Sequence, residues 1–404
     1  MTDFLQIIRE SIRDFFEFRQ VLKGTIRQKI GHDEEHLHAA MNWLYESWKH
    51  GKGGSASHYS LLHGKWLPPF PETTGYIIPT VFDYAHLFEK PQFREMAVQL
   101  THWLCKAQLD NGACMRGNYD EAKGKNEPVI FNSGQNLLGF IRAYTETGNE
   151  KFLGSAIRAA DFLVSSTDEH GIWNQHLLRG LKHTINVRCS WALLLMNSVK
   201  SNPDYSRVAI ANLDWTLNQQ TESGWFHHGT SKPGGLPNTH FLSYTCEGLL
   251  ESFLICGDKK YFEAAYKTAR QLLKLFQERK MLFAFWDEQW NNHGKYFGLF
   301  NGKLICVTGN IQISIVWMMI YKITKDMQFL TAAFRMQDYI KATQNINTSR
   351  PQIRGGIKGS FPVYGNYSVF KYPNWAAKFF CDALMKKINM KENYSKEKVQ
   401  DLQQ

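Results

Sequence analysis

Six residues whose side chains can carry a proton stand at, or in the loops before, the starts of segments that are expected to form buried helices. They are Glu72, Tyr76, His240, Tyr244, Asp287 and Tyr372. A carboxylate, an imidazole or a phenolate can remove a proton from carbon, and the protonated form of the same group can return it. Tyrosine needs a lowered pKa to act as a base near neutral pH, and a neighbouring lysine or arginine would provide that. We treat these six residues as the candidate catalytic groups.

A second set at the same helix starts combines amide, imidazole, aromatic and cationic side chains. It comprises His58, Asn132, Gln135, Asn186, Arg188, Trp290, Asn310, Gln312, Lys358, Tyr364, Asn374, Trp375 and Lys378. Amides bind sugar hydroxyls, aromatic rings stack on sugars, and cations pair with a carboxylate. Arg188 begins a nearly all-apolar helix, where the positive end of the helix dipole disfavours a cation unless an anion meets it. The set therefore favours an anionic sugar as the ligand.

Several of these residues could have a structural role instead of a catalytic or binding one. Asn132 is of a type that caps helices whatever the function. Glu72 follows a proline-rich approach that fixes the backbone, and it could form an ion pair instead of acting in catalysis. His32, His36 and His38 have the helical spacing of metal ligands, but they lie among acidic residues. We expect neither a metal site nor a cofactor.

Five copies of one short phrase indicate that helical hairpins carry these residues. In each copy a polar or charged loop leads into Phe or Tyr, and Ala follows four residues later. The aromatic positions are Phe93, Phe152, Tyr205, Tyr261 and Phe329. Each phrase opens an amphipathic segment, such as 152–164, and a segment that is apolar nearly all round precedes it, such as 308–324. This alternation predicts an inner ring of buried helices inside an outer ring of amphipathic ones.

The two ends of the chain supply a sixth hairpin. Five hairpins account for residues 75–343, and the helices expected at 34–48 and 374–387 would pair with each other. Pairing closes the ring and removes the hydrophobic ends that an open array would have to cap. The inner helices then run in one direction, so their N-termini and the preceding loops meet at one mouth. We predict an all-α fold, an (α/α)6 toroid or six-hairpin barrel, with one carbohydrate-sized cleft.

Three segments follow from this scheme: an N-terminal amphipathic helix and linker (1–33), the toroid domain (34–388) and a polar C-terminal tail (389–404) expected to fray. The extra N-terminal helix is expected within residues 2–30. Its apolar face comprises Phe4, Ile8, Ile12, Phe15, Leu22 and Ile26, and its charged face comprises Arg9, Arg13, Glu17 and Arg27. The helix could pack on the toroid or on a second subunit, or it could dock at a membrane interface.

The composition limits the cellular compartments and the binding partners that we expect for this protein. The chain has 404 residues, is 43% hydrophobic and carries a formal net charge of +10. This charge favours an anionic partner, and without a nucleic-acid-binding motif we exclude nucleic acid. Seven scattered cysteines without a CxxC pair indicate buried thiols in a reducing compartment. Because a secretory signal and a membrane-spanning run are lacking, we expect a cytoplasmic protein, or one peripheral at the inner membrane.

Four phrases resemble a family of toroidal proteins encoded with bacterial exopolysaccharide, capsule and O-antigen biosynthesis. They are LLHGKWLPPFPETTGYIIPT, FNSGQNLLGFIRAYTETGNEKFL, TGNIQISIVW, and GGIKGSFPVYGNY followed by YPNWAAKFFCDAL. The resemblance covers residues 34–388. The chain is also distantly similar to the helical C-terminal domain of D-glucuronyl C5-epimerases, although their preceding β-sheet region has no counterpart here. It shares its expected architecture with unsaturated glucuronyl hydrolases, N-acylglucosamine 2-epimerases and terpenoid cyclases.

Differences from these relatives narrow the expected chemistry. The glucuronyl hydrolases use aspartates near inner-helix starts, where this chain has Asn132 and Arg188, and the Asp-rich motif of the cyclases is absent. The resemblance implies a carbohydrate-active enzyme of bacterial polysaccharide biosynthesis. Our leading hypothesis is an epimerase or lyase that abstracts a proton from a uronic-acid-containing or other anionic glycan without a cofactor.

Two alternatives stay open at this point. One is a glycoside hydrolase that uses Glu72 and Asp287 as its two carboxylates. The other is a non-catalytic glycan-binding scaffold of a membrane-associated synthesis complex, held through residues 2–30. The expected partner is an anionic oligosaccharide or polysaccharide precursor.

Overall fold

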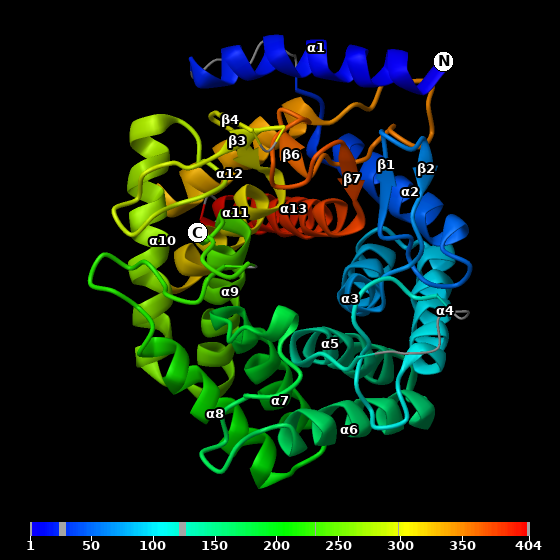
Figure 1. Ribbon diagram of the computed structural model, residues 1–404, viewed down its shortest axis with the longest axis vertical. Coiled ribbons are helices and arrows are strands. Elements are labelled where there is room, and N and C mark those ends of the chain that lie inside the picture. The colour runs from blue at the N-terminus through cyan, green and yellow to red at the C-terminus, as the bar shows by residue number, and fades with distance from the viewer. Residues whose placement is uncertain (1, 24–29, 121–126, 231, 298, 402–404) are drawn as a thin grey trace.

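Six helices form a closed inner ring in the computed structural model (Figure 1), which describes residues 2–23, 30–120, 127–230, 232–297 and 299–401. They are α3 (Pro71–Leu87), α5 (Ile130–Thr147), α7 (Val187–Val199), α9 (Thr239–Cys256), α11 (Val307–Thr324) and α13 (Asn374–Asp401). Each packs against the next, and α13 packs against α3. Most of their side chains are buried, as the nearly all-round apolar sequences predict.

Six outer helices each pack against one inner helix. They are α2 (Asp33–His50), α4 (Pro91–Ala107), α6 (Glu150–Ser165), α8 (Pro203–Leu217), α10 (Lys259–Arg279) and α12 (Met327–Thr343). α2 packs against α13, so the two ends of the ring domain form the sixth hairpin. The predicted (α/α)6 toroid is therefore confirmed.

The repeated phrase has a clear packing role. All five of its aromatic residues are buried at the starts of outer helices. The hydroxyl of Tyr205 donates to Asp161 at 2.8 Å, and that of Tyr261 donates to Asp214 at 2.9 Å. Both bonds join an outer helix to the outer helix before it. The repeated phrase thus supplies the side chains through which each hairpin packs on its neighbour.

Short strands and turns occupy the connections between hairpins. β1 (His58–Ser60) lies between β2 (Lys65–Trp66) and β7 (Lys371–Pro373) in a three-stranded antiparallel sheet. β3 (Lys295–Tyr296) pairs with β4 (Phe300–Asn301), and β5 (Ile305–Cys306) pairs with β6 (Ser360–Phe361). Two 3-10 turns, η2 (Leu178–Gly180) and η3 (Thr184–Asn186), precede α7. Pairing of β1 with β7 adds a second link between the two ends of the ring domain.

The N-terminal helix α1 (Thr2–Leu22) lies outside the ring (Figure 1). It packs on the toroid, which was one of the expected alternatives, through a face that combines acidic side chains with the apolar Phe18 and Val21. Glu10 and Asp14 are buried, whereas Ile8, Ile12 and Phe15 of the expected apolar face are exposed. The side chain of Phe4 and residues 24–29, with Ile26 and Arg27, lie outside the described part of the chain.

Two further expectations change. α13 continues as a helix through Asp401, so most of the segment expected as a frayed polar tail is helical. All seven cysteines are free, but Cys256 is exposed and Cys105 is half-buried, unlike the other five. In the described ranges, no helix combines the length and the apolar content needed to cross a bilayer.

Candidate functional site

Glu72 lies in the first turn of α3, at the mouth where the inner helices begin. Pro71 opens the helix, where its missing N–H costs nothing. The Glu72 side chain is largely buried, and burial raises its pKa to about 8 although Arg188 acts in the opposite direction. The carboxyl group is therefore mostly protonated at neutral pH, so it can donate a proton.

Arg188, in the first turn of α7, is held by two polar partners from neighbouring inner helices. Its Nη1 donates to Glu247 Oε2 at 2.5 Å, and its Nε donates to Gln135 Oε1 at 2.9 Å. The guanidinium also lies over the ring of Tyr244, 4.7 Å from its centroid. The anion that meets this cation at the helix start is therefore Glu247 of α9.

His240, in the first turn of α9, is the end of a short polar chain that starts at this ion pair. Gln312 Nε2 donates to Glu247 Oε2 at 3.4 Å, and Gln312 Oε1 contacts His240 Nδ1. Because the amide oxygen of Gln312 can only accept, His240 Nδ1 carries the proton and Nε2 carries the lone pair. Burial lowers the pKa of His240 to about 3, so the ring is neutral at pH 7. Nε2 is then available to accept a proton.

Aromatic rings fill the space between these polar groups. The ring of Tyr244 lies 4.2 Å from that of His240, and both contact Phe379, as does Tyr76. Burial raises the pKa of Tyr76 and of Tyr244, and the two phenols are close enough to affect each other. The lowered tyrosine pKa that a base would need is therefore not found. The Tyr244 hydroxyl is buried without a hydrogen bond of normal geometry, so it is free to donate one.

We call these residues the central cluster: Glu72, Tyr76, Gln135, Arg188, His240, Tyr244, Glu247, Gln312 and Phe379. Helix periodicity aligns them, since His240, Tyr244 and Glu247 follow each other at intervals of four and three on α9. Glycine allows the close approach of the helices. A Cβ at Gly309 would lie 2.4 Å from the backbone nitrogen of His240.

Two predicted site residues lie under α1 instead of in the central cluster. The Tyr372 hydroxyl donates to Glu10 Oε2 at 3.1 Å. Lys358 is buried and forms an ion pair with Asp14. Their roles in the structure are to hold α1 on the toroid.

Asp287 is engaged in its own turn. Its carboxylate accepts from the backbone N–H of Asn291 at 2.7 Å and from His293 Nε2 at 2.7 Å. Burial alone would raise the pKa of Asp287, but these hydrogen bonds lower it. These hydrogen-bond partners of Asp287, Asn291 and His293, lie in the same turn and outside the central cluster, so the structure does not join Asp287 to Glu72.

Three predicted amides brace loops at the mouth. Asn132 Nδ2 donates to the Met115 carbonyl at 3.0 Å, Asn374 Nδ2 donates to Thr73 Oγ1 at 2.9 Å, and Asn310 Nδ2 donates to two loop carbonyls. The side-chain oxygen of each is buried without a hydrogen-bond partner in the protein. Asn132 therefore has a structural contact, but it does not cap α5 as the alternative proposed: the N-cap is Val129, and the Asn132 side chain binds the Met115 carbonyl.

The other predicted binding residues lie on separate elements of the chain. His58 lies in β1, and burial together with nearby positive charge lowers its pKa to about 4. Asn186 ends η3, Trp290 Nε1 is 3.3 Å from Ser223 Oγ, and Trp375 follows Asn374 at the start of α13. The Tyr364 ring stacks on Phe297, 5.1 Å between centroids.

A cavity of about 620 Å³ lies on the other side of the Arg188–Glu247 pair. Its lining comes from the later turns of α3, α9 and α11 and from α13, and it includes Glu247, Glu251, Lys322 and Lys378. This cavity is therefore at the end of the ring opposite to the mouth, where the sequence had not placed one. Lys378 donates to Asp382 at 2.6 Å and lies over Phe379, so it borders both the cavity and the central cluster.

Glu247 is the functional candidate that the sequence analysis missed. Glu247 lies in the third turn of α9, away from the helix starts that the sequence pattern singles out. The sequence does carry a signal for Glu247, because a glutamate buried in a nearly all-apolar helix costs free energy unless it is paired. Within the described ranges, no group of three His, Cys, Asp or Glu residues is placed to hold a metal ion. His36 instead contacts Gln344 at 2.6 Å through its Nδ1.

Known structures share this architecture. No protein-family model and no curated protein matches the chain. An unsaturated glucuronyl hydrolase specific for heparin superposes with a TM-score of 0.70 at 15% identity, covering 89% of this chain and 98% of that one. The unsaturated glucuronyl hydrolase of Bacillus sp. GL1, described as responsible for glycosaminoglycan degradation, gives 0.69 at 14%, covering 88% and 96%. Cellobiose 2-epimerase from Bacillus thermoamylovorans gives 0.69 at 14%, covering 88% and 98%. These likenesses show that the chain has the (α/α)6 toroid fold that these glycan-processing enzymes share.

Proposed function

We propose that this protein is a carbohydrate-active enzyme that transfers a proton on an anionic glycan, without a cofactor, as an epimerase or lyase does. One observation carries the proposal. A neutral His240 with a free Nε2 and a protonated Glu72 both lie next to Arg188 and Tyr244. A proton acceptor and a proton donor in one water-poor site are what reversible proton transfer at carbon requires.

The chemistry suits a uronic acid. His240 Nε2 would take the proton from carbon 5, next to the carboxylate, and the electron pair would move onto the carboxylate to give an enolate-like intermediate. The buried hydroxyls of Tyr76 and Tyr244 would donate hydrogen bonds to that intermediate. Return of a proton from Glu72 on the opposite face gives the epimer. If the carbon–oxygen bond at carbon 4 breaks instead, Glu72 protonates the leaving oxygen and an unsaturated sugar results.

A negatively charged substrate would make His240 a stronger base. His240 is a weak base in the unliganded site because its pKa is about 3. A bound carboxylate favours the imidazolium form and so raises the pKa of His240. The formal net charge of +10 supports an anionic substrate. The resemblance noted in the sequence adds a role in bacterial polysaccharide biosynthesis to the proposal.

Glycoside hydrolysis is the second candidate. The raised pKa of Glu72 also suits the general acid that protonates a glycosidic oxygen. The likeness to unsaturated glucuronyl hydrolases favours this reading. A second carboxylate is the weaker part of this candidate, because Asp287 is held in its own turn and Glu247 is paired with Arg188.

Proton NMR in heavy water would distinguish these reactions. The purified protein is mixed with uronic-acid oligosaccharides, and the signal of the proton on carbon 5 is followed. We expect this signal to disappear by exchange, with or without a new vinyl signal from elimination. New reducing ends without exchange or a vinyl signal would support hydrolysis. Binding without any of these changes would support a non-catalytic glycan-binding scaffold and overturn the proposal.

A further inference from the structure

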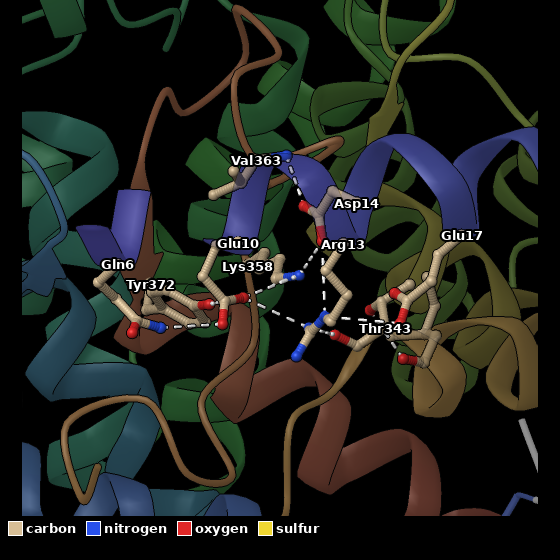
Figure 2. A network of polar contacts seen from close by, with 10 residues as sticks. Gln6, Glu10, Arg13, Asp14, Glu17, Thr343, Lys358, Val363 and Tyr372 are labelled. Atoms are coloured by element: carbon tan, nitrogen blue, oxygen red, sulfur yellow. Dashed lines mark hydrogen bonds and ion pairs between the residues drawn. The ribbon is translucent and has the colours of Figure 1, made fainter. Parts of the chain in front are cut away.

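The N-terminal helix α1 buries two carboxylates, Glu10 and Asp14, together with Phe18 and Val21. Asp14 and Glu10 are 0% and 3% exposed, and both pair with Lys358, which is 1% exposed (Figure 2). The backbone N–H of Val363 donates to Asp14 Oδ2 at 2.8 Å. A buried network of this kind fixes the rotation of the helix, because turning it would leave unpaired charges in the protein interior.

This rotation leaves the apolar face of α1 uncovered. Its exposed apolar side chains are Leu5, Ile8, Ile12, Phe15, Phe16 and Leu22. Ile12 is 53% exposed and Phe16 is 62% exposed. The spacing of three and four residues aligns these side chains along one side of the helix. Such a contiguous apolar strip on a water-facing helix marks an interaction surface.

From Leu5 onward, where the side chains of α1 are described, its exposed charges are all positive. In residues 5–23 these charges belong to Arg9, Arg19 and Lys23. Glu17 is half-buried beside Arg13, at 3.5 Å. Arg9 flanks the apolar strip, and Arg19 and Lys23 lie along its C-terminal end. Exposed apolar side chains together with cations are the pattern of a helix that lies in the interface of an anionic bilayer. A second copy of the chain fits less well, because two such faces would repel each other.

The β3–β4 hairpin also carries exposed apolar side chains. Leu299 is 75% exposed and Phe300 is 66% exposed. The neighbouring Phe297 stacks on Tyr364, whose chain neighbour Val363 is bonded to Asp14 of α1. In the view of Figure 1 the hairpin is drawn below α1. The exposed apolar side chains thus come from α1 and from the β3–β4 hairpin, and the segment 363–364 contacts both elements.

We propose that the exposed face of α1, together with Leu299 and Phe300 of the β3–β4 hairpin, docks the protein on an anionic lipid surface. Apolar side chains enter the boundary between headgroups and acyl chains, while Arg9, Arg19 and Lys23 contact lipid phosphates. The buried ion pairs with Lys358 hold the helix in the orientation that this requires. This inference is independent of the proposed catalytic function.

Vesicle flotation tests the proposal with the full-length protein. The probes are phosphatidylcholine vesicles with and without about one third phosphatidylglycerol, at low and at high salt. We expect binding to the anionic vesicles that weakens at high salt, and little binding to the neutral ones. The double variant Ile12→Ser/Phe16→Ser should bind about tenfold less or weaker still, because two inserted apolar side chains are lost.

The control variant is Leu254→Ser, which removes an exposed apolar side chain from α9 instead. It should bind like the wild type, and unchanged melting of all variants would show that they are folded. Absence of binding to anionic vesicles, or equal binding by the α1 variant, would overturn the proposal. A dimer that the α1 substitutions dissociate, without vesicle binding by the wild type, would also overturn it and assign this face to self-association.

Discussion

Replacing Glu72 by Gln should make the protein more stable than the wild type at alkaline pH. The folded protein holds Glu72 with a pKa of about 8, against an ordinary value of 4.5, because the carboxyl group is buried. The stability linked to this proton is fully present below pH 4.5 and is lost as pH rises through about 8. A neutral glutamine does not ionise, so the variant avoids that loss.

The size of the effect follows from the two pKa values. At about 1.4 kcal/mol per pKa unit, ionising Glu72 costs the folded state about 5 kcal/mol in total, of which about 4 kcal/mol falls between pH 5 and pH 9. Urea unfolding of both proteins at pH 5, 7 and 9 measures this difference directly. Glu222→Gln, a change of an exposed glutamate, is the control and should show no such trend. A stability difference between wild type and Glu72→Gln that is the same at pH 5 and pH 9 would refute the reasoning.

Three further substitutions test other parts of the account. Gln312→Ala removes the acceptor that orients His240, and we expect at least a tenfold fall in kcat with a shifted pH profile, measured by the exchange assay; an unchanged kcat would contradict this. Asp14→Asn leaves Lys358 poorly compensated and should cost about 3 kcal/mol of unfolding free energy in urea without changing kcat. Tyr372→Phe removes one hydrogen bond to α1 and should cost about 1 kcal/mol; loss of exchange activity in this variant would return Tyr372 to the catalytic candidates.

Most of the fold is encoded locally, which is why the sequence predicts it. The repeated aromatic and alanine pairs place each outer helix, and the buried Phe152 and Tyr261 confirm the pattern. Ring closure also follows, because two single helices at the ends have apolar faces to cover. The rotation of α1 is not encoded in this way. It depends on buried partners such as Lys358, which is 344 residues from Asp14 along the chain.

The candidate site could be predicted only in part, for the same reason. Glu72, Arg188 and His240 could be predicted because they stand at helix starts, and the structure brings them into one cluster. The protonation and pairing of these side chains depend on contacts between helices, which the spacing of residues along the chain does not specify. Arg188, for example, is paired with Glu247 in the third turn of α9. Asp287 has a suitable residue type, but its loop uses the carboxylate for its own turn.

The most direct test of the central claim compares two variants in the exchange assay. His240→Gln removes the proton acceptor, and Asp287→Asn changes a carboxylate outside the central cluster. We predict that loss of the carbon 5 proton signal in heavy water will be abolished in the first variant and retained in the second. Exchange that persists in His240→Gln, or that depends on Asp287, would contradict proton transfer at this cluster.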